Sequence, residues 1–190
     1  MQGSYNLGRT YGTNGSLFFD SIRNLYQNPN DLINVEGDQQ LDRRHILKLF
    51  GLYELPAGVQ VSGTFQYLSG MPIFIHRTGG TAGRHITGAY WVRFNRTEYP
   101  EIRTSAFIEV AAEPQGTRRL DGQKWLDLRA QKSVNLTPTM RLDFMADLYN
   151  VFNAGTVTRL QAVTTDLPNF LWPAEIMFPR AARLGVRLNF

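Results

Sequence analysis

The chain closes with the stretch Arg183-Leu184-Gly185-Val186-Arg187-Leu188-Asn189-Phe190. Every second residue from Leu184 to Phe190 is apolar, whereas the residues between them are arginine, glycine or asparagine. Side chains alternate between the two faces of a β-strand. The stretch therefore predicts a closing strand with one apolar face and one charged face.

The same alternation of apolar and polar residues recurs earlier in the chain, over about 44–55, 59–67, 125–136 and 140–149. It is imperfect in the first of these stretches, where Ile46, Phe50 and Leu52 lie on the polar face. Tyr5 and Leu7 mark a partial strand at the start. We expect about six strands of about ten residues, the length that a tilted strand needs to cross an outer membrane.

Two short connections have a length that the pattern fixes. Opposed residues of an antiparallel pair lie on one face, so three-residue turns at 56–58 and 137–139 set Leu55 opposite Val59 and Leu136 opposite Met140. The last position of the first turn needs a left-handed conformation, which glycine tolerates. The second register also sets Arg129 opposite Asp147, an opposite-charge pair.

Long connections alternate with these short turns, over about 9–40, 72–123 and 153–180. This order is typical of outer-membrane barrels. We predict an all-β fold: an antiparallel up-and-down transmembrane β-barrel segment with long extracellular loops and short periplasmic turns. Two alternatives stay open, a small pore or structural protein in which several copies close one barrel, and a soluble β-sandwich binding module.

Composition agrees with strands rather than helices. Apolar residues make up 43% and mean hydropathy is −0.28, and no apolar run approaches the roughly 20 residues of a membrane-spanning helix. The net charge of +4 is dispersed and does not suggest nucleic acid, and cysteine is absent. His76 and His85 flank a glycine-rich loop, but no carboxylate cluster completes a metal site. We expect no metal, cofactor or catalytic residue, and no enzyme activity.

Aromatic residues and one lysine bear on the membrane interpretation. Tyr53 and Phe190 lie on the apolar face near the short turns and Tyr67 near the other end, where interfacial girdles occur, whereas Trp125 lies on the polar face. Lys132 violates the apolar face. Lysine there costs about 2–4 kcal/mol at the midplane and about 0–1 kcal/mol near the interface, so we expect its ammonium to reach the periplasmic headgroups.

The closing stretch resembles the C-terminal signal by which outer-membrane barrels are recognised for insertion. We expect Gly185, Leu188 and Phe190 to carry this signal. The implied partners are the barrel-assembly machinery and the lipid of the bacterial outer membrane.

Several short motifs, in order, resemble the C-terminal barrel of TonB-dependent outer-membrane transporters, in particular the Oar-like branch. They are Asp42-Arg43-Arg44-His45, Tyr53 to Gly58, Tyr67 to Pro72, Leu126 to Arg129 with Lys132, Asp147 to Asn153, and Phe178 to Phe190. The resemblance implies a 22-stranded barrel with an N-terminal plug and substrate uptake energised through TonB. The plug is missing here, no signal peptide follows Met1, and the first strand is already under way. We therefore expect residues 1–190 to be the C-terminal portion of a larger barrel, which contacts TonB only through the missing plug.

Ligand contacts are expected in the outer loops, because loops carry much of protein recognition. The candidates are Tyr90, Trp91, Phe94, Tyr99 and Phe107. Charged residues of the polar face could line a substrate path or form an ion-pair lattice: Lys48, Glu54, Asp127, Arg129, Arg141, Asp143, Asp147, Arg183 and Arg187.

Overall fold

A computed structural model describes residues 1–13, 33–34, 36–39, 41–73, 75–76, 85–86, 91–103, 106–114, 116–161 and 168–190. The described part is built of β-strands, with one short 3-10 turn at Pro56–Gly58. Among these residues, no helix is long and apolar enough to cross a membrane.

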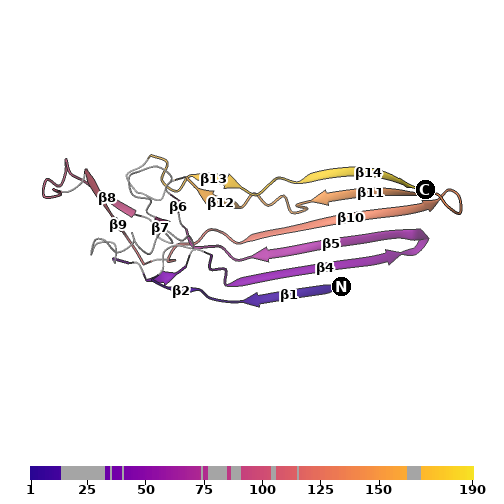
Figure 1. Ribbon diagram of the computed structural model, residues 1–190, viewed down its shortest axis with the longest axis horizontal. Coiled ribbons are helices and arrows are strands. Elements are labelled where there is room, and N and C mark those ends of the chain that lie inside the picture. The colour runs from indigo at the N-terminus through magenta and orange to yellow at the C-terminus, as the bar shows by residue number, and fades with distance from the viewer. Residues whose placement is uncertain are drawn as a thin grey trace.

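Six long strands form one antiparallel sheet in the order β1-β4-β5-β10-β11-β14 (Figure 1). Their bounds are Gln2–Leu7 for β1, His45–Leu55 for β4, Val59–Leu68 for β5, Gln123–Asn135 for β10, Arg141–Tyr149 for β11 and Ala181–Asn189 for β14. Each of these long strands pairs with the next long strand along the chain, and the short strands between them lie in the long connections. This is the up-and-down order that the hydrophobic pattern predicts, and the sheet is open, with β1 and β14 at its two edges.

Both predicted turns and their registers are confirmed. Leu55 lies opposite Val59, and the Leu136 amide donates to the Met140 carbonyl at 2.9 Å. Gly58 has the expected left-handed φ of 71°. Ala57 also has a positive φ, 63°, which the sequence does not indicate. The two turns are staggered, because Val59 lies opposite Lys132 while the second hairpin continues four residues further, to Leu136.

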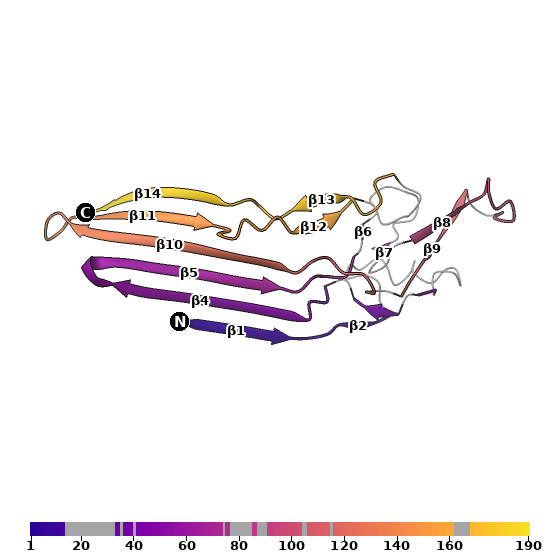
Figure 2. The same cartoon turned by 180° about the vertical axis from the view of Figure 1, so that it is seen from behind.

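The long connections contain short ladders at the end of the sheet opposite the two turns (Figure 2). They pair β2 (Tyr11–Gly12) with β3 (Gly37–Asp38), β6 (Ile75–His76) with β7 (His85–Ile86), β8 (Trp91–Asn95) with β9 (Phe107–Ala111), and β12 (Val157–Leu160) with β13 (Pro173–Ile176). The sequence interpretation treated these stretches as connections without strands. It missed the ladders because each is only two to five residues long, too short for alternation to register.

The sheet has two contrasting faces and almost no core. The only buried hydrophobic residues in the described ranges are Ile73, Ile102 and Leu160. The apolar side chains of the outer strands are exposed instead, with Leu184 84% and Val186 64% accessible. Within the described ranges the other ladders have two strands each, so the large second sheet of a β-sandwich is not among them.

Candidate functional site

The charged face of the sheet carries a row of ion pairs across three strands. Asp147 of β11, 6% exposed, lies between Arg129 of β10 and Arg183 of β14, with 2.7 Å from Arg183 Nη2 to Asp147 Oδ2. The register places Arg129 and Arg183 on either side of Asp147, as predicted for Arg129. Arg183 also lies over the Tyr149 ring, 5.8 Å from its centroid. These ion pairs join β14 to β11, and β11 to β10, on the charged face of the sheet.

A second buried carboxylate repeats this arrangement nearer the short turns. Asp143 is 2% exposed and accepts hydrogen bonds from Ser133 Oγ at 2.6 Å and from Asn189 Nδ2 at 2.8 Å. Arg141 Nε lies 3.0 Å from Asp143 Oδ1. Arg187 lies opposite Asp143 in the register. Five of the nine charged residues named for this face are therefore ion-paired, namely Arg129, Arg141, Asp143, Asp147 and Arg183, and a role of the face in lining a substrate path stays a prediction.

Asn150 joins the end of β11 to the segment that leads into β14. It has a left-handed φ of 47° and is 6% exposed. Its side-chain amide donates to the carbonyls of Ala154 at 3.1 Å and Phe178 at 2.7 Å, and its side-chain oxygen accepts the Ala154 amide at 3.0 Å. The Asn150 amide donates to Asp127 at 2.8 Å. These contacts give the Asp147–Asn153 motif a concrete structural role.

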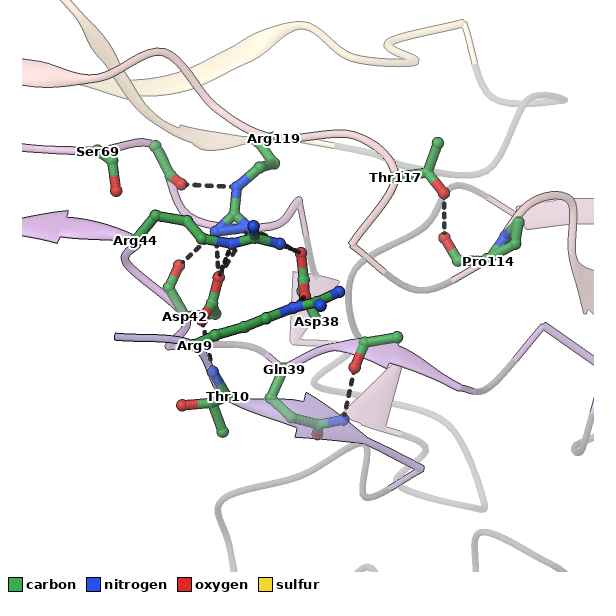
Figure 3. A network of polar contacts seen from close by, with 12 residues as sticks. Arg9, Thr10, Asp38, Gln39, Asp42, Arg44, Ser69, Pro114, Thr117 and Arg119 are labelled. Atoms are coloured by element: carbon green, nitrogen blue, oxygen red, sulfur yellow. Dashed lines mark hydrogen bonds and ion pairs between the residues drawn. The ribbon is translucent and has the colours of Figure 1, made fainter. Parts of the chain in front are cut away.

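A cluster of five charged residues lies where the sheet meets the long connections (Figure 3). We call it the mouth cluster: Arg9, Asp38, Asp42, Arg44 and Arg119. Arg9 Nε lies 2.8 Å from Asp38 Oδ1, and Arg44 Nη2 lies 2.6 Å from Asp38 Oδ2. Arg119 Nη1 donates to Asp42 Oδ2 at 2.9 Å. The cluster ties the segments after β1, before β4 and before β10 to one another.

Backbone groups complete the mouth cluster. The Thr10 amide donates to Asp42 Oδ1 at 2.6 Å, and Arg119 donates to the carbonyls of Gly70 and Asp42. Asp42 is 1% exposed, so its charge depends on these donors. A Cβ at Gly70 would lie 1.6 Å from the Leu120 carbonyl oxygen, so glycine is needed for this close approach.

The electrostatics of the mouth cluster favour the ionised form of Asp38. Burial opposes ionisation of Asp38, but the hydrogen bonds from Arg9 and Arg44 outweigh it and lower the pKa of Asp38 below its ordinary 3.8. The hydrogen bond to Asp38 in turn raises the pKa of Arg44. Three arginines against two aspartates leave the cluster with one net positive charge, so it presents a mildly cationic rim.

The residues of the predicted assembly signal lie on β14 and just beyond it. Leu188 belongs to the apolar face and is 46% exposed, and Phe190 follows the strand and is 95% exposed. Gly185 lies opposite Met145 on the charged face, and a Cβ there would meet Met145 at no less than 3.5 Å. Packing therefore does not require glycine at this position. The recognition role of these three residues stays a prediction.

The predicted ligand-contacting aromatics are only partly described. Tyr90 lies outside the described residues, and Trp91 begins β8. The ring of Phe94 packs edge-on against that of Tyr99, with centroids 5.2 Å apart, and Phe107 begins β9 opposite Asn95. The β8–β9 hairpin thus brings three of the five residues to one ladder, while their role in binding stays a prediction.

The histidines come closer together than the sequence suggests. The backbone ladder of β6 and β7 sets His76 directly opposite His85. Among the described residues, no three histidine, aspartate or glutamate side chains group closely enough to hold a metal ion.

The apolar face carries aromatics near both ends and two lysines. Tyr53 lies near the short turns, 69% exposed, and Phe152 packs on Phe65 near the long connections with ring centroids 6.3 Å apart. Lys124 lies opposite Tyr67, and Lys132 opposite Val59. The two lysines stand eight residues apart on β10, about 26 Å along a strand. They therefore lie toward opposite borders of the apolar face.

A single antiparallel sheet that is charged on one face and apolar on the other, with short turns at one end and long connections at the other, defines a segment of transmembrane β-barrel wall. A family model described as an outer membrane beta barrel domain matches residues 1–167, and the chain belongs to this family. Its location is therefore the bacterial outer membrane, and the soluble β-sandwich alternative is wrong. No curated protein and no solved structure gives a match.

Sequence reasoning missed the mouth cluster entirely. In the sequence, Asp42 and Arg44 stand only within a motif, and no motif contains Arg119. The available signal was a pair of adjacent arginines, Arg118-Arg119, at the end of a long connection. Arg118 pairs locally with Glu113, whereas Asp42, the partner of Arg119, lies 77 residues away, a distance across which no local pattern operates.

Proposed function

We propose that this chain forms the C-terminal part of the barrel wall of a TonB-dependent outer-membrane transporter of the Oar-like branch. The observation that carries the proposal is the order and spacing of the motifs along an outer-membrane barrel sheet. Two of these motifs contain residues that make buried polar contacts, Asp42 in the mouth cluster and Asn150 after β11. Such contacts give a reason for these residue types at these places.

In this role the charged face lines the interior and the β8–β9 hairpin belongs to the extracellular loops. The interior lattice of paired arginines and aspartates would contact a plug and water, and the loop aromatics Phe94, Tyr99 and Phe107 would contact the substrate. The chain itself would perform no catalysis and hold no cofactor. Its partners would be the remaining strands, the plug, the assembly machinery and lipid, with TonB acting only through the plug.

The test is the DNA immediately upstream of the Met1 codon, together with uptake by cells. An in-frame extension that encodes a plug and about sixteen more alternating strands is the expected result. Deletion of the gene should then abolish growth on the transported nutrient, as deletion of tonB does. An upstream stop codon, or uptake that is unchanged in both deletions, would refute the proposal.

A pore assembled from several copies is the second candidate, and one observation favours it. The six strands of the sheet alternate in direction, so the edges β1 and β14 are antiparallel to each other. An edge of one copy could pair with the opposite edge of another, which would satisfy the open backbone groups. A heat-sensitive oligomer in gel electrophoresis of this chain would support closure by copies, and a monomer would exclude it.

A further inference from the structure

A hollow of about 480 Å³ lies on the apolar face across β5, β10, β11 and β14. Ala130 and Ala146 lie directly opposite each other within it. Their methyl groups leave a depression between longer neighbours, among them Phe144, Leu184 and Val59. On a face that meets lipid, such a depression can hold part of an acyl chain.

One cationic side chain borders this hollow. Lys132 lies opposite both Phe144 and Val59, and Val59 is the first residue of β5 after a short turn. Within the described ranges, no carboxylate forms an ion pair with Lys132. A lysine on a lipid-facing surface is unfavourable unless its ammonium reaches the interface or meets an anion. Because Val59 follows a short turn, we expect the Lys132 ammonium to extend toward the periplasmic headgroups.

The order of these groups along the strand gives the site a direction. On β10, Lys132 lies nearer the short turn and Ala130 lies two residues further toward the long connections, which is deeper into the hydrocarbon. A lipid bound with its phosphate on Lys132 would therefore send its acyl chain away from the periplasm. That is the orientation of a phospholipid in the inner leaflet, and the reverse of a lipid in the outer leaflet.

We propose that this hollow binds an anionic phospholipid of the inner leaflet of the outer membrane. The phosphate contacts the Lys132 ammonium, and one acyl chain lies over Ala130 and Ala146 against Phe144. The site rests only on the outer-membrane location of the chain and not on a transport role, so its failure and that of the proposed function are separable.

The test uses the protein purified from outer membranes and exchanged into detergent. It is titrated with phosphatidylglycerol or with phosphatidylcholine, and bound lipid is counted by native mass spectrometry. Lys132→Gln should weaken phosphatidylglycerol binding about fivefold, the effect of one interfacial cation, and leave phosphatidylcholine binding unchanged. Ala146→Leu, which fills part of the hollow, should weaken the binding of both lipids. The matched control is Lys124→Gln, on the same face of the same strand at its other end, and it should change neither.

Several outcomes would overturn the proposal. The unchanged protein would bind phosphatidylglycerol and phosphatidylcholine equally, or Lys124→Gln would lose as much phosphatidylglycerol binding as Lys132→Gln, or Ala146→Leu would bind both lipids as well as the unchanged protein. If the unchanged protein is a dimer in detergent and Ala146→Leu is a monomer with the same amount of bound lipid, the hollow is a contact between two copies instead. Heat-modifiable migration of each variant in gels shows that it is folded, and Ala146→Val, which narrows the hollow by a smaller side chain, takes the place of Ala146→Leu if that variant does not assemble.

Discussion

Replacing Arg119 by methionine should loosen the mouth of the barrel without unfolding the wall. Methionine keeps much of the length of the side chain but donates no hydrogen bond. The substitution removes the donors to the Asp42 carboxylate, to the Asp42 carbonyl and to the Gly70 carbonyl. Asp42 keeps the Thr10 amide and a long contact of 3.4 Å to Arg44 Nε. A nearly fully buried carboxylate is then left with incomplete compensation.

The magnitude follows from the burial of the pair. Removing one partner of a buried ion pair costs about 3–5 kcal/mol. The Arg119 side chain is 24% exposed, and Arg44 still shields Asp42, so we take the lower end, about 3 kcal/mol. This corresponds to an increase of about 100-fold in the population in which the mouth cluster is open. The cost falls on local opening, because the cluster joins connections rather than strands of the sheet.

Amide hydrogen exchange measures this opening directly. The amides of Thr10 and Leu120, bonded to Asp42 and to the Met71 carbonyl, should exchange about 100-fold faster in Arg119→Met, while those of β10 and β11 keep their rates. Asp121→Asn, a neutralised exposed carboxylate nearby, is the control and should change neither. The double variant Arg119→Met with Asp42→Leu should regain most of the protection at the Leu120 amide, since a buried pair can be replaced by apolar groups, whereas the Thr10 amide has lost its acceptor and should stay fast. Unchanged exchange in Arg119→Met, or equal acceleration in the sheet, would refute the reasoning.

Four further outcomes are expected. Asn150→Ala leaves buried backbone groups unpaired and should lower the free energy of unfolding by about 2 kcal/mol, seen as a lower urea midpoint in vesicles, whereas an unchanged midpoint would contradict the bonding seen at this residue. Gly70→Ala should open the mouth, because its Cβ would lie 1.6 Å from the Leu120 carbonyl oxygen and the segment must shift; unchanged exchange of the Leu120 amide in this variant would contradict the close approach. Gly185→Ala should fold with unchanged stability, so that any loss of its outer-membrane level reports on recognition. Phe190→Glu in the protein expressed in cells should prevent assembly in the outer membrane, and normal levels would remove this residue from the signal. The pKa of Asp38 is lowered in the folded state, so its contribution to the stability of the mouth is complete above the unfolded value of 3.8. This contribution is lost as the pH falls through the folded pKa. Exchange protection at the mouth should therefore be flat from about pH 7 to 5 and fall below about pH 4.

The long strands could be predicted because their physics is local. A period of two fixes the faces, and parity then fixes turn length, which is why Leu55 opposite Val59 and Arg129 opposite Asp147 follow from the sequence alone. The charged and apolar faces followed from the same argument. The membrane setting needed two further observations: no second large sheet covers the apolar face among the described residues, and the chain matches an outer-membrane barrel family.

The mouth and the connections could not be predicted for the opposite reason. Asp42 meets Arg119 across 77 residues, and Asn150 meets the Phe178 carbonyl across 28. Neither pairing produces a periodic pattern in the sequence from which it could be predicted. The positive φ of Ala57 is a related case, since a turn of fixed length can place an ordinary residue in a conformation that its type disfavours.

The stagger between the two short turns has a consequence for the size of the complete barrel. The second turn begins four residues beyond the level of the first on β10, about 13 Å along the chain direction, over two inter-strand spacings of about 10 Å in total. Strands with such an offset must slant when their ends meet one membrane surface, and this shear, together with the number of strands, sets the radius at which a sheet closes. A plane parallel to the membrane therefore cuts the strands obliquely. Residues of β5 and β11 that lie at the same depth in the membrane are not the residues that the register places in line across β10.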